Sequence, residues 1–488
     1  MLAATLRASR RWLADPYGTL DAERARRGPT FWMELALVGR VLVTGDPALI
    51  REITAHPDLE AGSGIAALRR VLGEGSLITM DGEAHAARRR LVAPFFRRGL
   101  EVLDAATCAA TKDALRAVPP GGRLSIYDLG RQVSLRSIIQ FLLAAPPDEA
   151  ARAGRLVDAF LLSFESPWVL FLRPLQIDLG PLSPWGRALR NRERLRDFLR
   201  EHVRKARSGG GIGDKDGGVL ARIAQEAPDL SEDDIVAETL ALLLFGHDTG
   251  AAALAWAVAH IWRRPEVLAR VRAEADAAET IDPAAHPYLE ACLKESLRLS
   301  PVVVHLTRVA ARETRIGEHT VPAGARVFPC VYLAQRDPEV FAEPDVFRPE
   351  RFLEGQTYEG SWFPFGLGAR TCIGNRFALR QMLLTAATAA RCAELAPEPG
   401  WEPRPVRRLV LVVPEGGTRM VRPLPLAPSP VRPPPALPER ERGNACAASS
   451  RKGSLFFGRW RPSPARGGGM GARAGEGTGE GAGGGMAR

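Results

Sequence analysis

The spacing of apolar and polar residues predicts a mainly α-helical protein with small β-sheets. Between residues 100 and 207 apolar side chains recur at helical spacing, with breaks at 119–122 and 146–147, where proline and glycine gather. Residues 30–44 carry apolar and β-branched side chains on both sides of a glycine, which predicts a β-hairpin. An Asp-Pro pair at 46–47 follows, so a helix is expected to begin there.

One stretch is apolar nearly all round and predicts a long buried helix. Ser231 precedes three acidic residues, as is typical of a helix start, and Pro265 is a stop signal. The roughly 33 residues between them would form a helix about 50 Å long. Because 235–261 lacks a polar face, we expect this helix to cross the centre of the fold.

The last third of the chain is expected to add short strands. Apolar runs predict strands around Arg315, Val321 and Val327. Residues 409–413 and 419–421 flank a Pro-Glu-Gly-Gly turn and predict a second hairpin.

Composition divides the chain into two parts. From Pro428 onward proline, glycine and arginine dominate, and such a segment buries too little apolar surface to fold. We therefore expect a folded domain at 1–427 and a disordered tail at 428–488.

The charge balance argues against nucleic-acid binding. The formal net charge is +10, but residues 428–488 hold ten lysines and arginines against four glutamates, which accounts for +6. The remaining 427 residues are therefore only weakly basic, so a nucleic-acid partner is not expected.

Cysteine usage and the amino-terminal segment point to a reducing compartment. The six cysteines show no CxxC pair and no regular spacing, which disfavours disulfide and zinc frameworks. Arginines interrupt the apolar residues of 1–15, so neither a membrane anchor nor a signal peptide is expected there. We expect a cytoplasmic protein.

The segment around Cys372 is the strongest chemical signal. Glycines at 366, 368 and 374 allow tight turns around one cysteine, and a helix is expected directly behind it, from Asn375 to Ala390. Backbone N–H groups and the amino terminus of that helix would lower the thiol pKa. A sulfur in this setting serves as a nucleophile or as a metal ligand, whereas a lone cysteine beside glycines is more often a buried apolar residue.

The spacing Phe-x-x-Gly-x-Arg-x-Cys-x-Gly from Phe365 to Gly374 resembles the haem-binding loop of the cytochrome P450 family. That resemblance implies a triangular prism of helices with haem b (iron protoporphyrin IX) buried between the long central helix and the cysteine loop. Cys372 would be the axial ligand of the iron, and Phe365 and Gly366 would contact the cofactor.

The centre of the long helix resembles the oxygen-activation motif of the same family. The family places a glycine, an acid and an alcohol there, which implies catalytic roles for Asp248 in proton relay and for Thr249 in hydrogen bonding to dioxygen. Glycines in a buried helix are costly, so we expect the helix to loosen at Gly246 and Gly250, although a purely structural kink is the alternative. Phe245, where a small residue is usual, and Gly250, in place of a second hydroxyl, depart from the motif.

Basic residues are expected to hold the haem propionates. His85 and Arg89 lie one turn apart on a predicted helix, and by resemblance they, Arg308 and Arg370 would bind the two carboxylates. The alternative for an Arg-rich helix is a solvated face. Other arginines would form a basic surface for an acidic electron donor: Arg88, Arg90, Arg376 and Arg380.

A second charged group is expected to be structural. Glu295 and Arg298 are spaced as a surface ion pair, yet with Arg351 they resemble a triad that supports the cysteine loop in the family. By resemblance, apolar residues of three segments would line the substrate pocket: Phe164, Trp168, Phe171, Phe245, Gly246, Val302, Val304 and Leu306.

The resemblance implies a monomeric haem-thiolate monooxygenase. It would insert one oxygen atom from O2 into a lipophilic small molecule (a fatty acid, terpenoid or polyketide) and reduce the other to water. Electrons would come from a separate ferredoxin or flavodoxin, since the chain has no flavin, dinucleotide or iron–sulfur motif. Two alternatives stay open: a peroxide-driven peroxygenase or isomerase on the same scaffold, and a haem sensor or carrier without turnover.

Overall fold

A computed structural model describes residues 2–36, 38–73, 75–163, 176–209, 218–354, 358, 360–408 and 410–424. All of them belong to one compact unit, Met1–Pro433. The division expected between residues 427 and 428 falls outside the described residues and stays a prediction.

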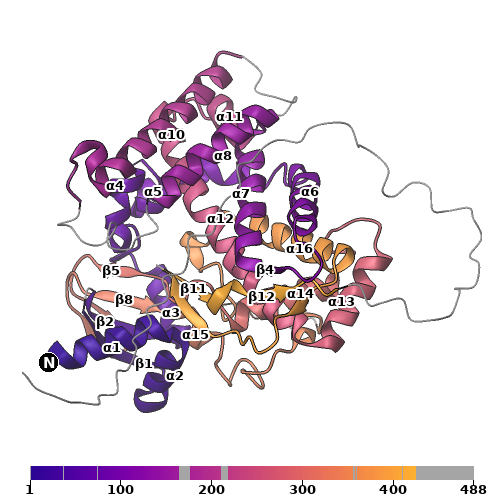
Figure 1. The fold of residues 1–488 in the computed structure, drawn as a ribbon. Helices are drawn as coiled ribbons and strands as arrows, with labels where there is room; N and C mark the ends of the chain where they lie inside the picture. The colour runs from indigo at the N-terminus through magenta and orange to yellow at the C-terminus, as the bar shows by residue number, and fades with distance from the viewer. Residues whose placement is uncertain are drawn as a thin grey trace, which may run out of the picture. The chain divides into compact units, whose positions relative to one another are not determined.

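Helices form most of the described chain (Figure 1). The first group precedes the long central helix: α1 (Leu2–Ala14), α2 (Pro16–Arg27), α3 (Pro47–Ala55), α4 (Arg69–Leu72), α5 (Gly82–Val92), α6 (Val102–Arg116), α7 (Ile126–Leu143), α8 (Pro147–Leu162), α10 (Pro184–Arg207) and α11 (Val219–Glu226). The second group begins with that helix: α12 (Glu232–Trp262), α13 (Pro265–Ala277), α14 (Pro287–Leu299), α15 (Val331–Ala334) and α16 (Asn375–Cys392).

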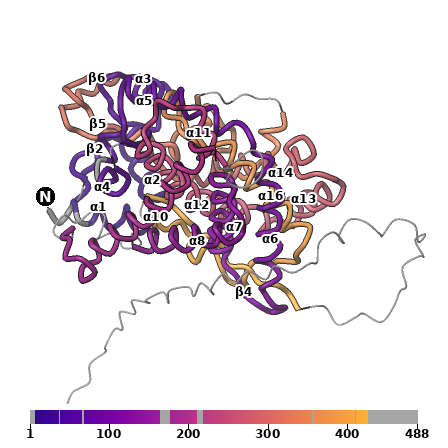
Figure 2. The backbone as a smooth tube through the Cα atoms, turned by 90° about the horizontal axis from the view of Figure 1, so that it is seen from above, coloured from indigo at the N-terminus to yellow at the C-terminus, as the bar shows by residue number. Residues whose placement is uncertain are grey.

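The long helix predicted between Ser231 and Pro265 is confirmed as α12. Ser231 caps it through a capping box with Asp234, and most of its side chains are buried. Helices α7, α10, α14 and α16 pack around it, and it lies among helices in both views (Figures 1 and 2). It is the one described helix with the length and hydropathy of a membrane span, but 67% of its apolar window is buried inside the protein. A core helix accounts for this composition.

A five-stranded sheet stands beside the helices. Its order is β1 (Thr30–Leu35), β2 (Gly39–Thr44), β8 (Arg326–Pro329), β5 (Arg308–Ala310) and β3 (Leu59–Glu60). The predicted hairpin is confirmed as β1 and β2, which pair from Thr30 with Thr44 to Leu35 with Gly39. The helix predicted at the Asp-Pro pair is confirmed too, because the Asp46 carboxylate accepts hydrogen bonds from two N–H groups at the start of α3. The strands expected around Arg315 and Val321 form a separate hairpin, β6 (Thr314–Ile316) and β7 (His319–Val321).

The hairpin predicted between residues 409–413 and 419–421 is wrong, because these two strands do not pair with each other. Strand β11 (Leu411–Pro414) pairs with β10 (Pro405–Arg408). Strand β12 (Arg419–Val421) instead joins β4 (Arg123–Ser125) and β9 (Ala396–Pro397) in a three-stranded sheet. The turn at 415–417 thus carries the chain from one sheet to another.

Candidate functional site

The cysteine loop leads directly into α16. Gly366 and Gly368 have positive φ angles of 78° and 67°, which side chains rarely adopt. The turn is closed by the Cys372 N–H, which donates to the Phe365 carbonyl at 2.7 Å. A side chain at Gly366 would come within 3.7 Å of Leu306, so the loop approaches the segment after α14 closely. The sequence therefore presents Cys372 at a tight turn with open surface around it.

The thiol pKa differs from the sequence expectation. Although Cys372 is an exposed residue, desolvation by the protein packed around its sulfur raises the pKa of the thiol above its ordinary value. The Gly374 N–H and the charge of Arg89 act in the opposite direction but are the smaller effects. Because a metal ligand must be a thiolate, metal coordination at this sulfur would release a proton.

Four basic residues from three segments gather beside Cys372; we call them the positive cluster: His85 and Arg89 on α5, Arg308 on β5, and Arg370 in the cysteine loop. Burial and the charges of Arg370, Arg89 and Arg308 lower the pKa of His85 to about 4. Burial likewise lowers the pKa of Arg308 to about 10, and its buried Nη2 has no hydrogen-bond partner among the described residues. The cluster therefore has positive charge and a buried donor to offer to an anion.

The described carboxylate closest to this cluster is Asp81. It accepts an Arg370 Nη2 hydrogen bond at 2.6 Å, and its two oxygens also accept the backbone N–H groups of residues 61, 62 and 63. Arg370 also donates to the Met80 carbonyl, and Arg89 donates to the Thr371 carbonyl at 2.6 Å. Arg89 and Arg370 thus tie α5 and the loop before it to the cysteine loop. One carboxylate faces three arginines, since His85 with a pKa of about 4 is neutral near pH 7.

Glu295, Arg298 and Arg351 form a second, fully buried group, the buried triad. Arg298 donates to both Glu295 oxygens at 2.7 and 2.8 Å, and Arg351 donates to Glu295 Oε1 at 3.1 Å. The residues are 0%, 0% and 2% exposed, so this is not a surface ion pair. Carbonyls of residues 335, 342, 344 and 346 accept the remaining arginine N–H groups.

Gln335 links the triad to the cysteine loop. Its carbonyl accepts from Arg298 at 2.9 Å, while its side-chain oxygen accepts the Phe363 N–H at 3.0 Å. Phe363 stands at the start of the loop, two residues before Phe365. The triad therefore braces the loop through one intermediate residue.

The middle of α12 is half-buried on two faces, one of which carries Leu244 and Asp248. The other face is called here the half-exposed strip. Leu242, Phe245, Gly246 and Thr249 are half-buried and share one face by helical spacing. The Thr249 hydroxyl donates to the Phe245 carbonyl at 2.7 Å. A strip of this kind is expected where a helix lines an internal space.

Asp248 points to a different neighbour, α7. Its Oδ1 accepts the Tyr127 hydroxyl at 2.5 Å and lies 3.3 Å from Arg131 Nε. Burial and the Asp248 charge raise the pKa of Tyr127, so the phenol stays protonated and remains a donor. Tyr127 and Arg131 were missed by the sequence reasoning; their i, i+4 spacing on α7 is common on helices and gives no specific signal.

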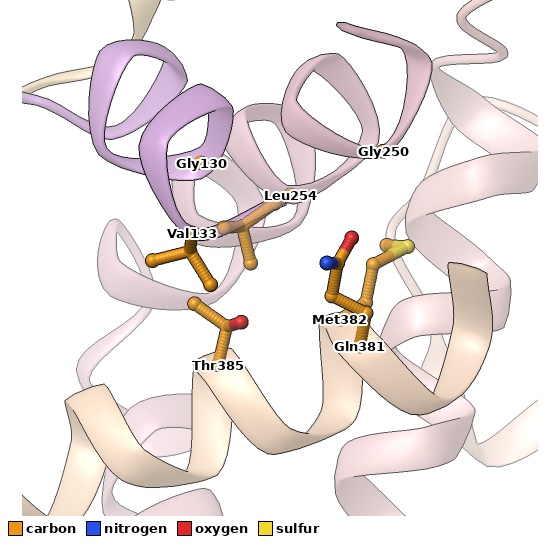
Figure 3. Close-up of a pocket in the computed structure, with 7 residues that line it drawn as sticks. All are labelled: Gly130, Val133, Gly250, Leu254, Gln381, Met382 and Thr385. Atoms are coloured by element: carbon orange, nitrogen blue, oxygen red, sulfur yellow. The ribbon is translucent and has the colours of Figure 1, made fainter. Parts of the chain in front are cut away.

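The predicted loosening of α12 at its glycines is wrong, because the helix is regular throughout. A Cβ at Gly246 would meet Ile138 of α7 at 2.3 Å, and one at Gly250 would meet Gln381 of α16 at 3.1 Å. Figure 3 shows the Gln381 amide rising from α16 toward α12 below Gly250. Both glycines thus allow neighbouring helices to pack closely, which explains the absent second hydroxyl at Gly250.

The predicted pocket residues are placed unevenly. Phe164, Trp168 and Phe171 lie outside the described residues. Val302 and Val304 are 7% and 1% exposed and belong to the hydrophobic core, whereas Val303, His305 and Leu306 are half-buried. Val303, His305 and Leu306 are therefore better candidates for lining a pocket than Val302 and Val304. Of these three, only Leu306 was predicted.

These residues fit a haem group. Its two carboxylates need cations and buried donors, which the positive cluster supplies with Arg308 Nη2. Its iron needs a sulfur or nitrogen ligand, and Cys372 lies beside Arg89 of that cluster. The positive φ at position 366 favours glycine, and because glycine has no side chain the loop leaves room there for a bound group.

The cations, the buried donor and the cysteine gathered here are the groups that a haem-binding protein requires. Comparison with known proteins gives the family: the model described as Cytochrome P450 matches residues 22–420. The chain belongs to the cytochrome P450 family and is a haem-iron monooxygenase.

Curated relatives agree with the family assignment, and solved structures share the fold. Cytochrome P450 135B1 of Mycobacterium tuberculosis is 29% identical over 407 residues, covering 82% of this chain and 86% of that protein. Cytochrome P450 138 of the same organism is 29% identical over 408 residues, covering 81% and 89%. The fold is similar to that of retinoic acid-bound cyanobacterial CYP120A1, with a TM-score of 0.68, 23% identity and coverage of 85% and 95%. It is also similar to CYP102L1, with a TM-score of 0.66, 22% identity and coverage of 83% and 98%.

Proposed function

We propose that this monooxygenase oxidises a lipophilic small molecule at haem b held by Cys372 and the positive cluster. The observation that carries the proposal is the gathering of four basic groups next to that cysteine, with Asp81 as the nearby carboxylate. Haem with a thiolate ligand supplies reductive activation of dioxygen. Arg308 and His85 would bind the propionates, while Arg370 and Arg89 would also fix α5 against the loop.

Two residues of α12 would handle protons. Thr249 lies on the half-exposed strip, and a hydroxyl that now donates to the Phe245 carbonyl can rotate toward a bound ligand. Asp248 is held by Tyr127 and Arg131 through Oδ1. We propose that Asp248 passes protons from the α7 side while these two partners set its position.

The electron donor would be an acidic ferredoxin or flavodoxin that docks near Cys372. Two of the four arginines expected there are internally paired: Arg88 with Asp234 at 2.9 Å, and Arg380 with Asp104 at 2.5 Å. In the described part of the chain no acidic side chain pairs with Arg90 or Arg376, and both are exposed. The docking surface would therefore centre on these two, on a cytoplasmic monomer.

The substrate would be lipophilic because half-buried apolar side chains stand on α12 and in the segment after α14. Phe245, Val303 and Leu306 offer apolar area, and Phe245 narrows the space at the central helix. A fatty acid, a terpenoid or a polyketide meets this requirement.

The test has two parts. The reduced, carbon monoxide-bound protein should show the red-shifted Soret band of a thiolate-ligated haem, and a library of lipophilic compounds should include members that shift the ferric haem to high spin. Product formation with a ferredoxin system but not with peroxide alone would support the monooxygenase cycle in this form. Turnover with peroxide and no donor would replace it with a peroxygenase, and absence of any spin shift or turnover would reject it.

A further inference from the structure

A half-buried arginine outside the positive cluster, Arg407, has no carboxylate partner in the described part of the chain. Arg407 lies on β10 opposite Val412 of β11. Its Nε and Nη2 are buried and have no hydrogen-bond partner among the described residues. Burial lowers the pKa of Arg407 to about 10, and the two groups that act against this are the Tyr17 phenol and the Cys330 thiol.

This arginine resembles the predicted propionate ligands but lies elsewhere. Arg308 also combines burial with an unpartnered guanidinium nitrogen. The charges that act on His85 and on Arg308 come from the positive cluster and Asp81, and Arg407 is not among them. The haem carboxylates therefore leave Arg407 unexplained, and its free donors call for another anion.

The position of Arg407 connects it to the segment after α14, which includes the half-buried His305. Val412, its partner in the hairpin, donates its N–H to the Val302 carbonyl at 2.8 Å. His305, two residues beyond Val303, feels the charge of Arg407 and has an unpartnered Nδ1 of its own. Both side chains lie against Trp12: the Arg407 guanidinium 4.5 Å from its ring, and the His305 ring 5.7 Å away.

We propose, building on the proposed function, that the substrate carries a carboxylate that binds the Nε–Nη2 edge of Arg407, with His305 as a further hydrogen-bonding group. Nε and Nη2 form one edge of the guanidinium, and that edge receives the two oxygens of a carboxylate. Trp12 and Phe328, on which His305 stacks at 3.9 Å, would flank the acid with aromatic surface. The subsite selects a carboxylic acid among the lipophilic candidates.

Imidazole-tipped acids test this subsite whatever the natural substrate is, because their imidazole nitrogen binds haem iron and shifts the Soret band. A series of ω-imidazolyl alkanoic acids of increasing chain length is titrated against the matching methyl esters. At the chain length that spans from the iron to Arg407, the acid should bind about tenfold more tightly than the ester or better. Equal affinity of acid and ester at every length would overturn the proposal.

Variants locate the effect. Arg407→Gln should reduce the acid-to-ester ratio to within about twofold, and Arg407→Lys, which keeps the charge but loses the two-nitrogen edge, should leave an intermediate ratio. Arg404→Gln, an exposed neighbour on the same segment, is the matched control and should keep the wild-type ratio. A wild-type ratio in both Arg407 variants would assign the arginine to packing against Trp12. Failure of imidazole itself to shift the Soret band would instead reject the proposed haem site.

Discussion

The buried triad is fully buried and the positive cluster is buried in part, and the two groups differ in how their charges are balanced. In the triad, Glu295 is bonded by Arg298 and Arg351, and backbone carbonyls accept the remaining arginine N–H groups. In the positive cluster, three arginines stand against one nearby carboxylate, Asp81, which pairs with Arg370, and Arg308 keeps a buried donor without a partner among the described residues. A network in which every charged group has its partners supports the fold. A network with an unpartnered buried donor is suited to binding a ligand.

The largest effect is expected at the cysteine that the open cluster adjoins. Cys372→Ala removes the only loop sulfur that can ligate iron, so the red-shifted Soret band of the reduced carbon monoxide complex should disappear. Difference spectroscopy measures it, with Cys392→Ala on α16 as the control that should keep the band. Persistence of the band in Cys372→Ala would assign the ligand to another residue.

Breaking the closed network should cost the most stability. Glu295→Gln leaves Arg298 and Arg351 buried without a counter-charge, so the free energy of unfolding should fall by about 3–5 kcal/mol. Glu290→Gln on the same helix breaks the half-exposed pair with Lys294 at 3.0 Å and should cost less than about 1 kcal/mol. Denaturant unfolding followed by circular dichroism compares the two; equal losses would contradict a special role for the triad.

Removing a cation from the positive cluster should weaken retention of the cofactor and leave folding unaffected. Arg308→Gln removes a cation that the haem-free protein leaves unpaired, so the unfolding free energy of the haem-free chain should stay the same or rise. Haem transfer to apomyoglobin should become about tenfold faster, because a charged hydrogen bond to a propionate is lost. The exposed Arg315→Gln serves as the control, and unchanged haem transfer in Arg308→Gln would remove Arg308 from the binding group.

The smallest effect concerns the partner of Asp248. Tyr127→Phe removes one hydrogen bond, so coupling of oxygen consumption to product should drop by roughly two- to tenfold, and the solvent isotope effect should change. Tyr332→Phe, which removes a similar buried bond to Asp21 at 2.8 Å, is the matched control. If both variants behave alike, the role of Tyr127 is structural.

The features that could be predicted from the sequence are those determined by residues close together in the chain. The capped, proline-free run of α12 and the glycines around Cys372 are written in consecutive residues, so their elements could be predicted. The contact between Tyr127 and Asp248 joins residues 121 positions apart, and no local signal indicates it. The glycines of α12 were misjudged because their effect depends on Ile138 and Gln381, which belong to other helices.

The strand partners show the same limit. Residues 411–414 and 419–421 look like a hairpin by spacing alone, but β10 offers β11 an adjacent edge, while β4 and β9 receive β12. Thiol chemistry was misjudged for a related reason, since local N–H groups were weighed without the burial that raises the Cys372 pKa.

The parallel pairing of β2 with β8 has a consequence for the order in which the protein is made. Val41 pairs with Arg326, so the edge of the first hairpin must wait for nearly 300 further residues to leave the ribosome. Until then β2 presents an open strand edge to other chains. Slow synthesis or a truncation before β8 should therefore promote aggregation through this edge, and production of the protein should benefit from conditions that protect nascent chains.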